Sequence, residues 1–123
     1  MSNWNILVIE DDPDGQEVVS RILRHHNLQP SVVGTAEEAL VVLQQADYIA
    51  AVIDLALPGM DGWHLLHEIR SIPYLQNLPC VAITAYHSAE VAVDAIDAGF
   101  DAYFPKPLDP TSFVRELERV INA

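Results

Sequence analysis

The chain of 123 residues is long enough for one domain with a buried core, and its hydrophobic content of 50% excludes a disordered polymer. Eighteen acidic residues against six lysines and arginines give a formal net charge of −12, which disfavours direct contact with nucleic acid phosphates or anionic lipid. No apolar run approaches the ~20 residues that span a bilayer, and the first residues do not resemble a signal peptide. The single cysteine excludes an internal disulfide, so we expect a cytoplasmic protein. The acidic charge leads us to expect no direct contact with nucleic acid or membrane.

Short apolar runs bounded by polar or turn residues predict buried strands. Most of these runs are continuous rather than alternating, which is typical of strands covered on both faces, as in a parallel sheet. The expected strands, of which the second is short and more polar, span residues 6–9, 31–33, 49–53, 80–83 and 102–104.

Helical patterns separate the expected strands. Apolar residues repeat at helical spacing in each segment, and capping residues mark several helix ends. The patterns are Val18, Val19, Ile22 and Leu23 before His25; Leu40 and Leu43 after a capping box at Thr35; Trp63, Leu66 and Ile69; Val91, Ala95 and Ile96, all expected to face inward, between Ser88 and Gly99; and Phe113, Leu117, Val120 and Ile121 after Pro110.

Strand and helix alternate five times with short connections, which predicts a doubly wound α/β sandwich of three layers. Five strands fit the flavodoxin-like (βα)5 fold, a parallel sheet with strand order 2-1-3-4-5. We expect residues 1–123 to form a single domain of this kind, with no output domain in the chain.

Polar side chains stand where the expected strands end. The first strand runs into Glu10 and Asp11, the third into Asp54, the fourth into Thr84, and Lys106 follows the fifth. Open α/β sheets bind ligands outside the carboxyl ends of their strands, so we expect these side chains on one rim. Because Lys106 is the only lysine of a strongly acidic chain, its position favours a specific role over general solubility.

The chemistry of this cluster is that of phosphoryl transfer. Carboxylates from Glu10, Asp11 and Asp54 repel one another unless a cation neutralises them, and a site open on one side suits Mg²⁺ above all, or Mn²⁺. With the ion present, Asp54 can act as a carboxylate nucleophile toward phosphorus. Lys106 would balance charge on the phosphoryl oxygens, and the Thr84 hydroxyl would donate to one of them.

Four segments strongly resemble the receiver domains of response regulators in two-component signalling, the CheY-like family. They are ILVIEDD at 6–12, VIDLALPGMDG at 52–62, ITA at 83–85 and KP at 106–107. The resemblance covers essentially the whole chain, with the segments in the order and spacing of the family. Each segment alone is weakly specific, but the set indicates one response regulator receiver domain.

The resemblance implies a role for each matching residue of the acidic cluster. Asp54 would be the phosphoacceptor and Asp11 a direct metal ligand, while Glu10 would act largely through a metal-bound water. The third protein ligand would be the backbone carbonyl of Ala56, so that its side chain plays no part.

The remaining matches imply a switch. Lys106 would contact the phosphoryl group, and its bond to Pro107 would be cis. Thr84 would swing toward the phosphoryl group, and Tyr103 would turn from exposed to buried. The added charge of about −1.5 to −2 would thereby alter the face formed by the fourth helix, the fifth strand and the fifth helix.

The implied protein is a signalling phosphoacceptor and not an enzyme in the usual sense, since it would catalyse only its own phosphorylation and slow dephosphorylation. Its phosphodonor would be a sensor histidine kinase or a histidine phosphotransfer protein, and its output an unidentified downstream protein. Asp101 matches the charge pattern of receivers that dimerise, but the fourth helix has no lysine or arginine and Glu116 stands where those receivers carry arginine. We therefore expect a monomer or a weak dimer.

Two alternatives keep the fold but not the function. A phosphorylation-independent interaction module would usually lack the phosphoacceptor or the lysine, and both are present here. A flavin-binding protein would need a Ser-, Thr- or Gly-rich phosphate loop after the first strand, where this chain has the acidic residues 10–12.

Other candidate ligands favour structural roles. His25 and His26 are adjacent on a helix and point in different directions, so a shared metal is not expected. Cys80 opens a buried strand and fits a small core residue, and Trp63 fits helix packing. Asp12 is expected as an outer contributor to the metal site.

Overall fold

The computed structural model describes residues 5–123; residues 1–4, which include most of the stretch judged unlike a signal peptide, lie outside the described part. The elements are β1 (Asn5–Ile9), α1 (Pro13–His25), β2 (Gln29–Val33), α2 (Ala36–Leu43), β3 (Ala50–Asp54), α3 (Gly62–Ser71), the short 3₁₀ helix η1 (Pro73–Leu75), β4 (Cys80–Thr84), α4 (Ala89–Ala98), β5 (Ala102–Pro105) and α5 (Pro110–Ile121). Every predicted strand and helix is present. Within residues 5–123, none of the helices combines the length and the apolar character needed to cross a membrane.

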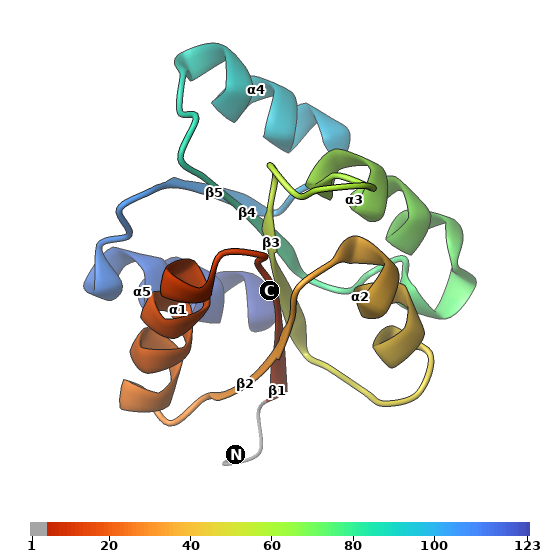
Figure 1. Ribbon diagram of the computed structural model, residues 1–123, viewed down its shortest axis with the longest axis horizontal. Coiled ribbons are helices and arrows are strands. Elements are labelled where there is room, and N and C mark those ends of the chain that lie inside the picture. Colours follow the sequence, from red (N-terminus) through yellow and green to blue (C-terminus); the bar gives the residue numbers. More distant parts are fainter. Residues whose placement is uncertain (1–4) are drawn as a thin grey trace.

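The strands form one parallel sheet in the order β2-β1-β3-β4-β5, which confirms the predicted fold. Helices α1 and α5 cover one face, and α2, α3 and α4 lie on the other (Figure 1). Side chains alternate along each strand between the two cores: Ile6 and Val8 point toward α1 and α5, whereas Leu7 and Ile9 point toward the opposite helices. Burial on both faces explains the continuously apolar strand sequences.

Side-chain caps and a glycine define the predicted helix ends. Thr35 accepts a hydrogen bond from the backbone N–H of Glu38 at the start of α2, over 3.0 Å. Ser88 does the same for Val91 at the start of α4, over 3.1 Å. The chain leaves α4 at Gly99 with φ of 115°, in the left-handed region that favours glycine.

Helix α4 is the least covered helix of the sandwich. Ala95 is its one fully buried residue, whereas α1, α3 and α5 each bury four residues. Ile96 was predicted to face inward, and this is wrong, since it is 50% exposed. Val18 in α1 also faces outward, while its neighbour Val19 is buried. In both helices apolar residues occupy two adjacent stripes, and periodicity alone does not choose the buried one, which is why the prediction for Ile96 was wrong.

Candidate functional site

The carboxyl ends of the central strands bring the predicted residues to one rim. Strands β1 and β3 pair in parallel, so Glu10, which follows β1, stands next to Asp54, the last residue of β3. Thr84 ends the neighbouring strand β4. The backbone N–H of Lys106 donates to the carbonyl oxygen of Thr84 over 2.8 Å, which attaches the loop after β5 to the same rim.

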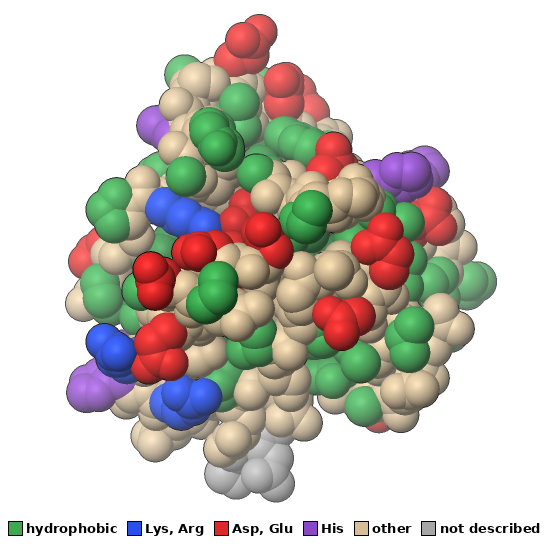
Figure 2. Space-filling view, viewed as in Figure 1, with side chains coloured by type: hydrophobic (Ala, Val, Ile, Leu, Met, Phe, Trp, Pro, Cys, Tyr) green, Lys and Arg blue, Asp and Glu red, His purple; other side chains and the backbone are tan. Residues whose placement is uncertain are grey.

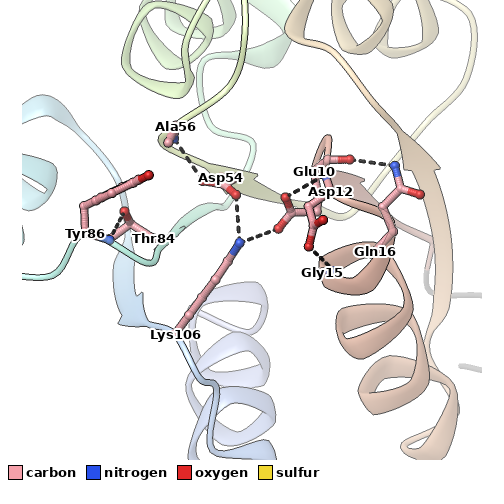
Figure 3. Close-up of polar contacts among 9 residues, drawn as sticks. All are labelled: Glu10, Asp12, Gly15, Gln16, Asp54, Ala56, Thr84, Tyr86 and Lys106. Carbon is pink, nitrogen blue, oxygen red and sulfur yellow. Dashed lines mark hydrogen bonds and ion pairs between the residues drawn. The ribbon is translucent and has the colours of Figure 1, made fainter.

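The ammonium group of Lys106 bridges two buried carboxylates (Figure 3). Its Nζ lies 2.6 Å from Oε1 of Glu10 and 2.8 Å from Oδ2 of Asp54. Burial lowers the pKa of Lys106, but hydrogen bonds to Asp54 and Glu10 and the charges of both outweigh burial, so that its pKa lies above the usual range. Lys106 is therefore a fixed positive charge at the rim. Its bond to Pro107 is cis, as the resemblance implied.

Glu10 is enclosed on several sides. Its backbone carbonyl accepts a hydrogen bond from Nε2 of Gln16 over 2.7 Å. A Cβ atom on Gly15 would stand only 2.6 Å from Oε1 of Glu10, so helix α1 approaches this closely only because position 15 has no side chain. Burial raises the pKa of Glu10; hydrogen bonding to Lys106 opposes this and Asp54 adds to it, leaving the pKa raised. Sequence reasoning missed both Gln16 and Gly15, although a glycine in the first turn of a helix is a signal of close approach.

Asp54 is fixed by backbone as well as by Lys106. Its Oδ1 accepts a hydrogen bond from the backbone N–H of Ala56 over 2.9 Å, so each carboxylate oxygen has a donor. Gly62 begins α3 directly against this turn. A Cβ atom there would meet the carbonyl oxygen of Asp54 and lie 2.8 Å from Cα of Leu55. The start of α3 therefore packs directly on the backbone that follows β3, and Ala56 in the intervening loop is exposed.

The acidic residues at the rim fit a divalent cation. Glu10, Asp11 and Asp54 each offer a carboxylate oxygen, and these oxygens lie within 4.8 Å of one another. Asp11 is exposed while Glu10 and Asp54 are buried, so the cluster opens to solvent on one side. Three carboxylates against the single ammonium of Lys106 leave the rim negative. Oxygen donors, negative charge and an open side are what Mg²⁺ requires.

The two predicted switch residues lie beside this cluster, not in it. Thr84 is buried, and its Oγ1 accepts from the backbone N–H of Tyr86 over 3.0 Å, which leaves the hydroxyl hydrogen free (Figure 3). Tyr103 is half-buried, and its hydroxyl lies 2.9 Å from Nδ1 of His87. His87 is exposed, and no sequence pattern marks its contact with Tyr103.

Asp12 caps helix α1, in addition to lying beside the acidic cluster. Its Oδ2 accepts a hydrogen bond from the backbone N–H of Gly15 over 3.0 Å, and Pro13 follows as the first residue of α1. Aspartate followed by proline is a known helix start, so this cap was visible in the sequence. The backbone N–H of Asp12 also donates to Oε2 of Glu10 over 3.2 Å, which links the cap to the site.

Asp101, which matches the charge pattern of dimerising receivers, is engaged within the chain. Its Oδ2 accepts from the backbone N–H of Cys80 over 2.9 Å and from Nη2 of Arg70 over 3.3 Å. The Arg70 guanidinium also donates to the carbonyl oxygens of Leu78 and Gly99, over 2.8 and 3.1 Å. This network joins α3 to the start of β4 and to the turn before β5.

Comparison with known proteins agrees with this geometry. The family model described as response regulator receiver domain matches residues 6–118. Chemotaxis protein CheY-3 of Vibrio cholerae is 31% identical over 123 residues, which cover 98% of this chain and 93% of that protein.

Two solved structures extend the likeness to three dimensions. A putative response regulator from Chloroflexus aurantiacus has a TM-score of 0.94 at 26% identity, and the match covers 98% of this chain and 99% of that one. The receiver domain of the sensor histidine kinase PA1611 from Pseudomonas aeruginosa, solved with a magnesium ion coordinated in its active site cleft, has a TM-score of 0.90 at 28% identity, with 98% and 99% coverage. The rim of acids with its lysine, the strand order and these matches together show that the chain belongs to the response regulator receiver domains of two-component signalling.

Proposed function

We propose that this receiver is a phospho-accepting switch and that Asp54 is its phosphoacceptor. The observation that carries the proposal is the bridge from the Lys106 ammonium to Asp54 and Glu10, at a rim where Asp11 adds a third carboxylate. The phosphoryl group would come from the phosphohistidine of a sensor histidine kinase or of a histidine phosphotransfer protein.

Asp54 supplies the nucleophile for this transfer. One of its carboxylate oxygens forms a bond to phosphorus while the bond from phosphorus to the donor's imidazole nitrogen breaks, and that nitrogen keeps the electron pair. The Lys106 ammonium, already 2.8 Å from Oδ2 of Asp54, offsets the charge on the phosphoryl oxygens. Hydrolysis of the aspartyl phosphate later restores the free carboxylate, so the chain acts as a switch and not as an enzyme with an external product.

Four groups would hold the metal: the carboxylates of Glu10, Asp11 and Asp54, and the backbone carbonyl of Ala56. Mg²⁺ or Mn²⁺ bound there supplies further positive charge for the transferring group. The magnesium ion coordinated in the cleft of the Pseudomonas receiver supports this assignment.

Thr84 and Tyr103 would report the phosphoryl group to the surface. The hydroxyl hydrogen of Thr84 is free and would be donated to a phosphoryl oxygen. Tyr103 would move inward from its half-buried position and give up its contact with His87. The face formed by α4, β5 and α5 would then regulate a downstream protein in the cytoplasm.

The test is phosphorylation of the purified chain by acetyl phosphate with Mg²⁺, followed by intact-mass measurement. Wild type should gain the mass of one phosphoryl group, and the gain should disappear in EDTA. Asp54→Asn should gain nothing, because an amide is not a nucleophile of this kind. Asp47→Asn is the matched control: it removes one exposed carboxylate far from the rim and should be phosphorylated like wild type.

A wild-type chain that stays unmodified with acetyl phosphate, and also with phosphorylated histidine kinases of the source organism, would contradict the proposal. Equal signalling by Asp54→Asn and wild type in the native pathway would instead support the phosphorylation-independent interaction module.

A further inference from the structure

Helix α4 presents an apolar and acidic side to solvent that nothing in residues 5–123 covers. Its one fully buried residue is Ala95. Val93 is 59% exposed and Ile96 is 50% exposed, although both are large aliphatic side chains. Exposed aliphatic residues that stand together on a helix are a recurring feature of binding surfaces.

The exposed residues of α4 fall into two adjacent stripes. A residue turns by about 100° around the helix axis relative to the one before it, which places Val93 and Ile96 on one side of the helix, away from Ala95. The neighbouring side is entirely acidic. We call the two stripes together the α4 surface; its members are Glu90, Val93, Asp94, Ile96 and Asp97.

The charge of this surface is not balanced nearby in the sequence. Positions 71–105 contain neither lysine nor arginine. The cations that bracket this stretch, Arg70 and Lys106, are held by Asp101 and by the carboxylates of the rim respectively. On the side of the molecule drawn in Figure 2, red and green side chains gather over α4 and no blue ones do.

We propose that the α4 surface binds a cationic protein segment whose own apolar side chains pack on Val93 and Ile96. Acidic side chains repel DNA, RNA and anionic membranes, so the complementary occupant is a peptide rich in lysine or arginine. The apolar stripe adds the requirement that this segment be amphipathic, since a basic segment without apolar residues would leave Val93 and Ile96 exposed. Such a segment would be the partner of the face formed by α4, β5 and α5. This rests on the proposed function only in that phosphorylation of Asp54 would regulate the binding.

The probe is a fluorescein-labelled synthetic peptide designed as an amphipathic helix, with lysines on one side and leucines on the other. Its control is a scrambled peptide of the same composition, which has the same charge but no apolar side. The wild-type chain should bind the amphipathic peptide more tightly than the scrambled one in fluorescence anisotropy. In a ¹⁵N–¹H spectrum, the amide signals that shift should be those of residues 89–98.

Two variants separate the charge from the apolar stripe. Glu90→Gln combined with Asp94→Asn and Asp97→Asn should weaken the amphipathic peptide about 10-fold, as expected for three exposed ion pairs. Val93→Ser with Ile96→Ser should weaken it by a similar factor of about 10, and both variants should retain the melting temperature of wild type to within a few degrees, because the altered side chains are exposed.

The matched control neutralises three acids elsewhere on the molecule, the exposed Glu17 and Asp47 and the half-buried Glu68, with Glu17→Gln, Asp47→Asn and Glu68→Gln. It makes the same change in net charge and should alter the affinity less than about 2-fold. Equal losses in this control and in the α4 charge variant would overturn the inference, since the peptide would then be sensing net charge alone. Equal binding of the two peptides would also overturn the inference, and so would binding of anionic vesicles or duplex DNA at α4. A third contradicting result would be a dimer in sedimentation that Val93→Ser with Ile96→Ser dissociates.

Phosphorylation separates this inference from the proposed function. If acetyl phosphate adds a phosphoryl group but the α4 variants bind the peptide like wild type, the inference fails and the proposed function stands. If no phosphoryl group is added but the peptide still distinguishes the α4 variants from the control, the inference stands and the proposed function fails.

Discussion

Lys106 donates to Glu10 over 2.6 Å across 96 positions of sequence, and this contact joins the loop after β5 to the end of β1. It is shorter than the contact of the same ammonium with Asp54, at 2.8 Å. Glu10 and Asp54 are both buried, so Lys106 is the counter-ion that allows two carboxylates to lie side by side. The residue that we propose for phosphoryl transfer therefore also supports the fold.

Replacing Lys106 with methionine should destabilise the chain in EDTA. Two buried carboxylates lose their cation, and because the lysine side chain is 24% exposed we expect the free energy of unfolding to fall by about 2–3 kcal/mol. Urea denaturation followed by circular dichroism measures this. Saturating Mg²⁺ should restore part of the loss. Arg21→Met, which removes an exposed pair with Glu17, should change stability by less than about 1 kcal/mol. Equal losses in the two variants would show that Lys106 is not a buried counter-ion.

Gly62→Ala should be destabilising even though alanine is the better helix former. The added Cβ would meet the carbonyl oxygen of Asp54 and stand 2.8 Å from Cα of Leu55, so the backbone at Asp54 must move. We expect a loss of about 2–4 kcal/mol in thermal unfolding and slower phosphorylation by acetyl phosphate. In the control Gly34→Ala the nearest atom is 3.7 Å away, on the Glu38 side chain, and stability should stay within about 1 kcal/mol of wild type.

The thiol of Cys80 should be unreactive in the folded chain. Burial raises its pKa from 9.0 to about 12, so the folded state holds the proton more tightly than the unfolded state. This contribution to stability is complete below pH 9 and is lost as pH rises toward 12. Ellman's reagent at pH 8 should react slowly with native protein and rapidly in guanidinium chloride.

The pH dependence itself is checked against Cys80→Ala. Between pH 9 and 12, the unfolding free energy of wild type should fall more steeply than that of this variant, which has no thiol to ionise. Parallel curves would mean that the thiol has the same pKa in both states.

The Asp101 carboxylate should stabilise the folded chain, because it accepts hydrogen bonds from two donors. Asp101→Ala leaves the backbone N–H of Cys80 and the Arg70 guanidinium without their shared acceptor, at an expected loss of about 1–3 kcal/mol in urea denaturation. Asp101→Asn keeps one carbonyl oxygen as an acceptor and should lose less. Asp47→Ala, at an exposed position, should be neutral. If Asp101→Ala were also neutral, the network would have no net stabilising effect.

Most of the fold and the place of the site follow from the sequence because they depend on patterns that the backbone imposes. Continuous apolar runs such as 80–83 must be buried on both faces, and parallel strands bring their carboxyl ends together. Glu10, Asp54 and Lys106 could therefore be assigned to one rim before any coordinates were known.

The remaining details depend on side-chain conformations that the spacing of apolar residues in the sequence does not determine. His87 reaches Tyr103 across 16 positions only because both rings turn toward each other. Ile96 and Val91 occupy neighbouring stripes of a helix rich in apolar residues, and only the packing of α4 on the sheet decides that Ile96 faces outward. The cap that Asp12 forms was visible from the proline that follows it, but we considered Asp12 only as an outer contributor to the metal site.

Helix α4 contributes one buried residue, Ala95, to the core on its side of the sheet, and Val91 packs against that core. Local opening of so lightly packed an element requires much less free energy than global unfolding, and its amides should exchange with deuterium before those of α5, which buries four residues. A small difference in free energy at the rim is then enough to redistribute the conformations of this helix. The molecule thus combines a sheet buried on both faces with one lightly packed helix, whose conformation the proposed phosphorylation could alter at low cost in free energy.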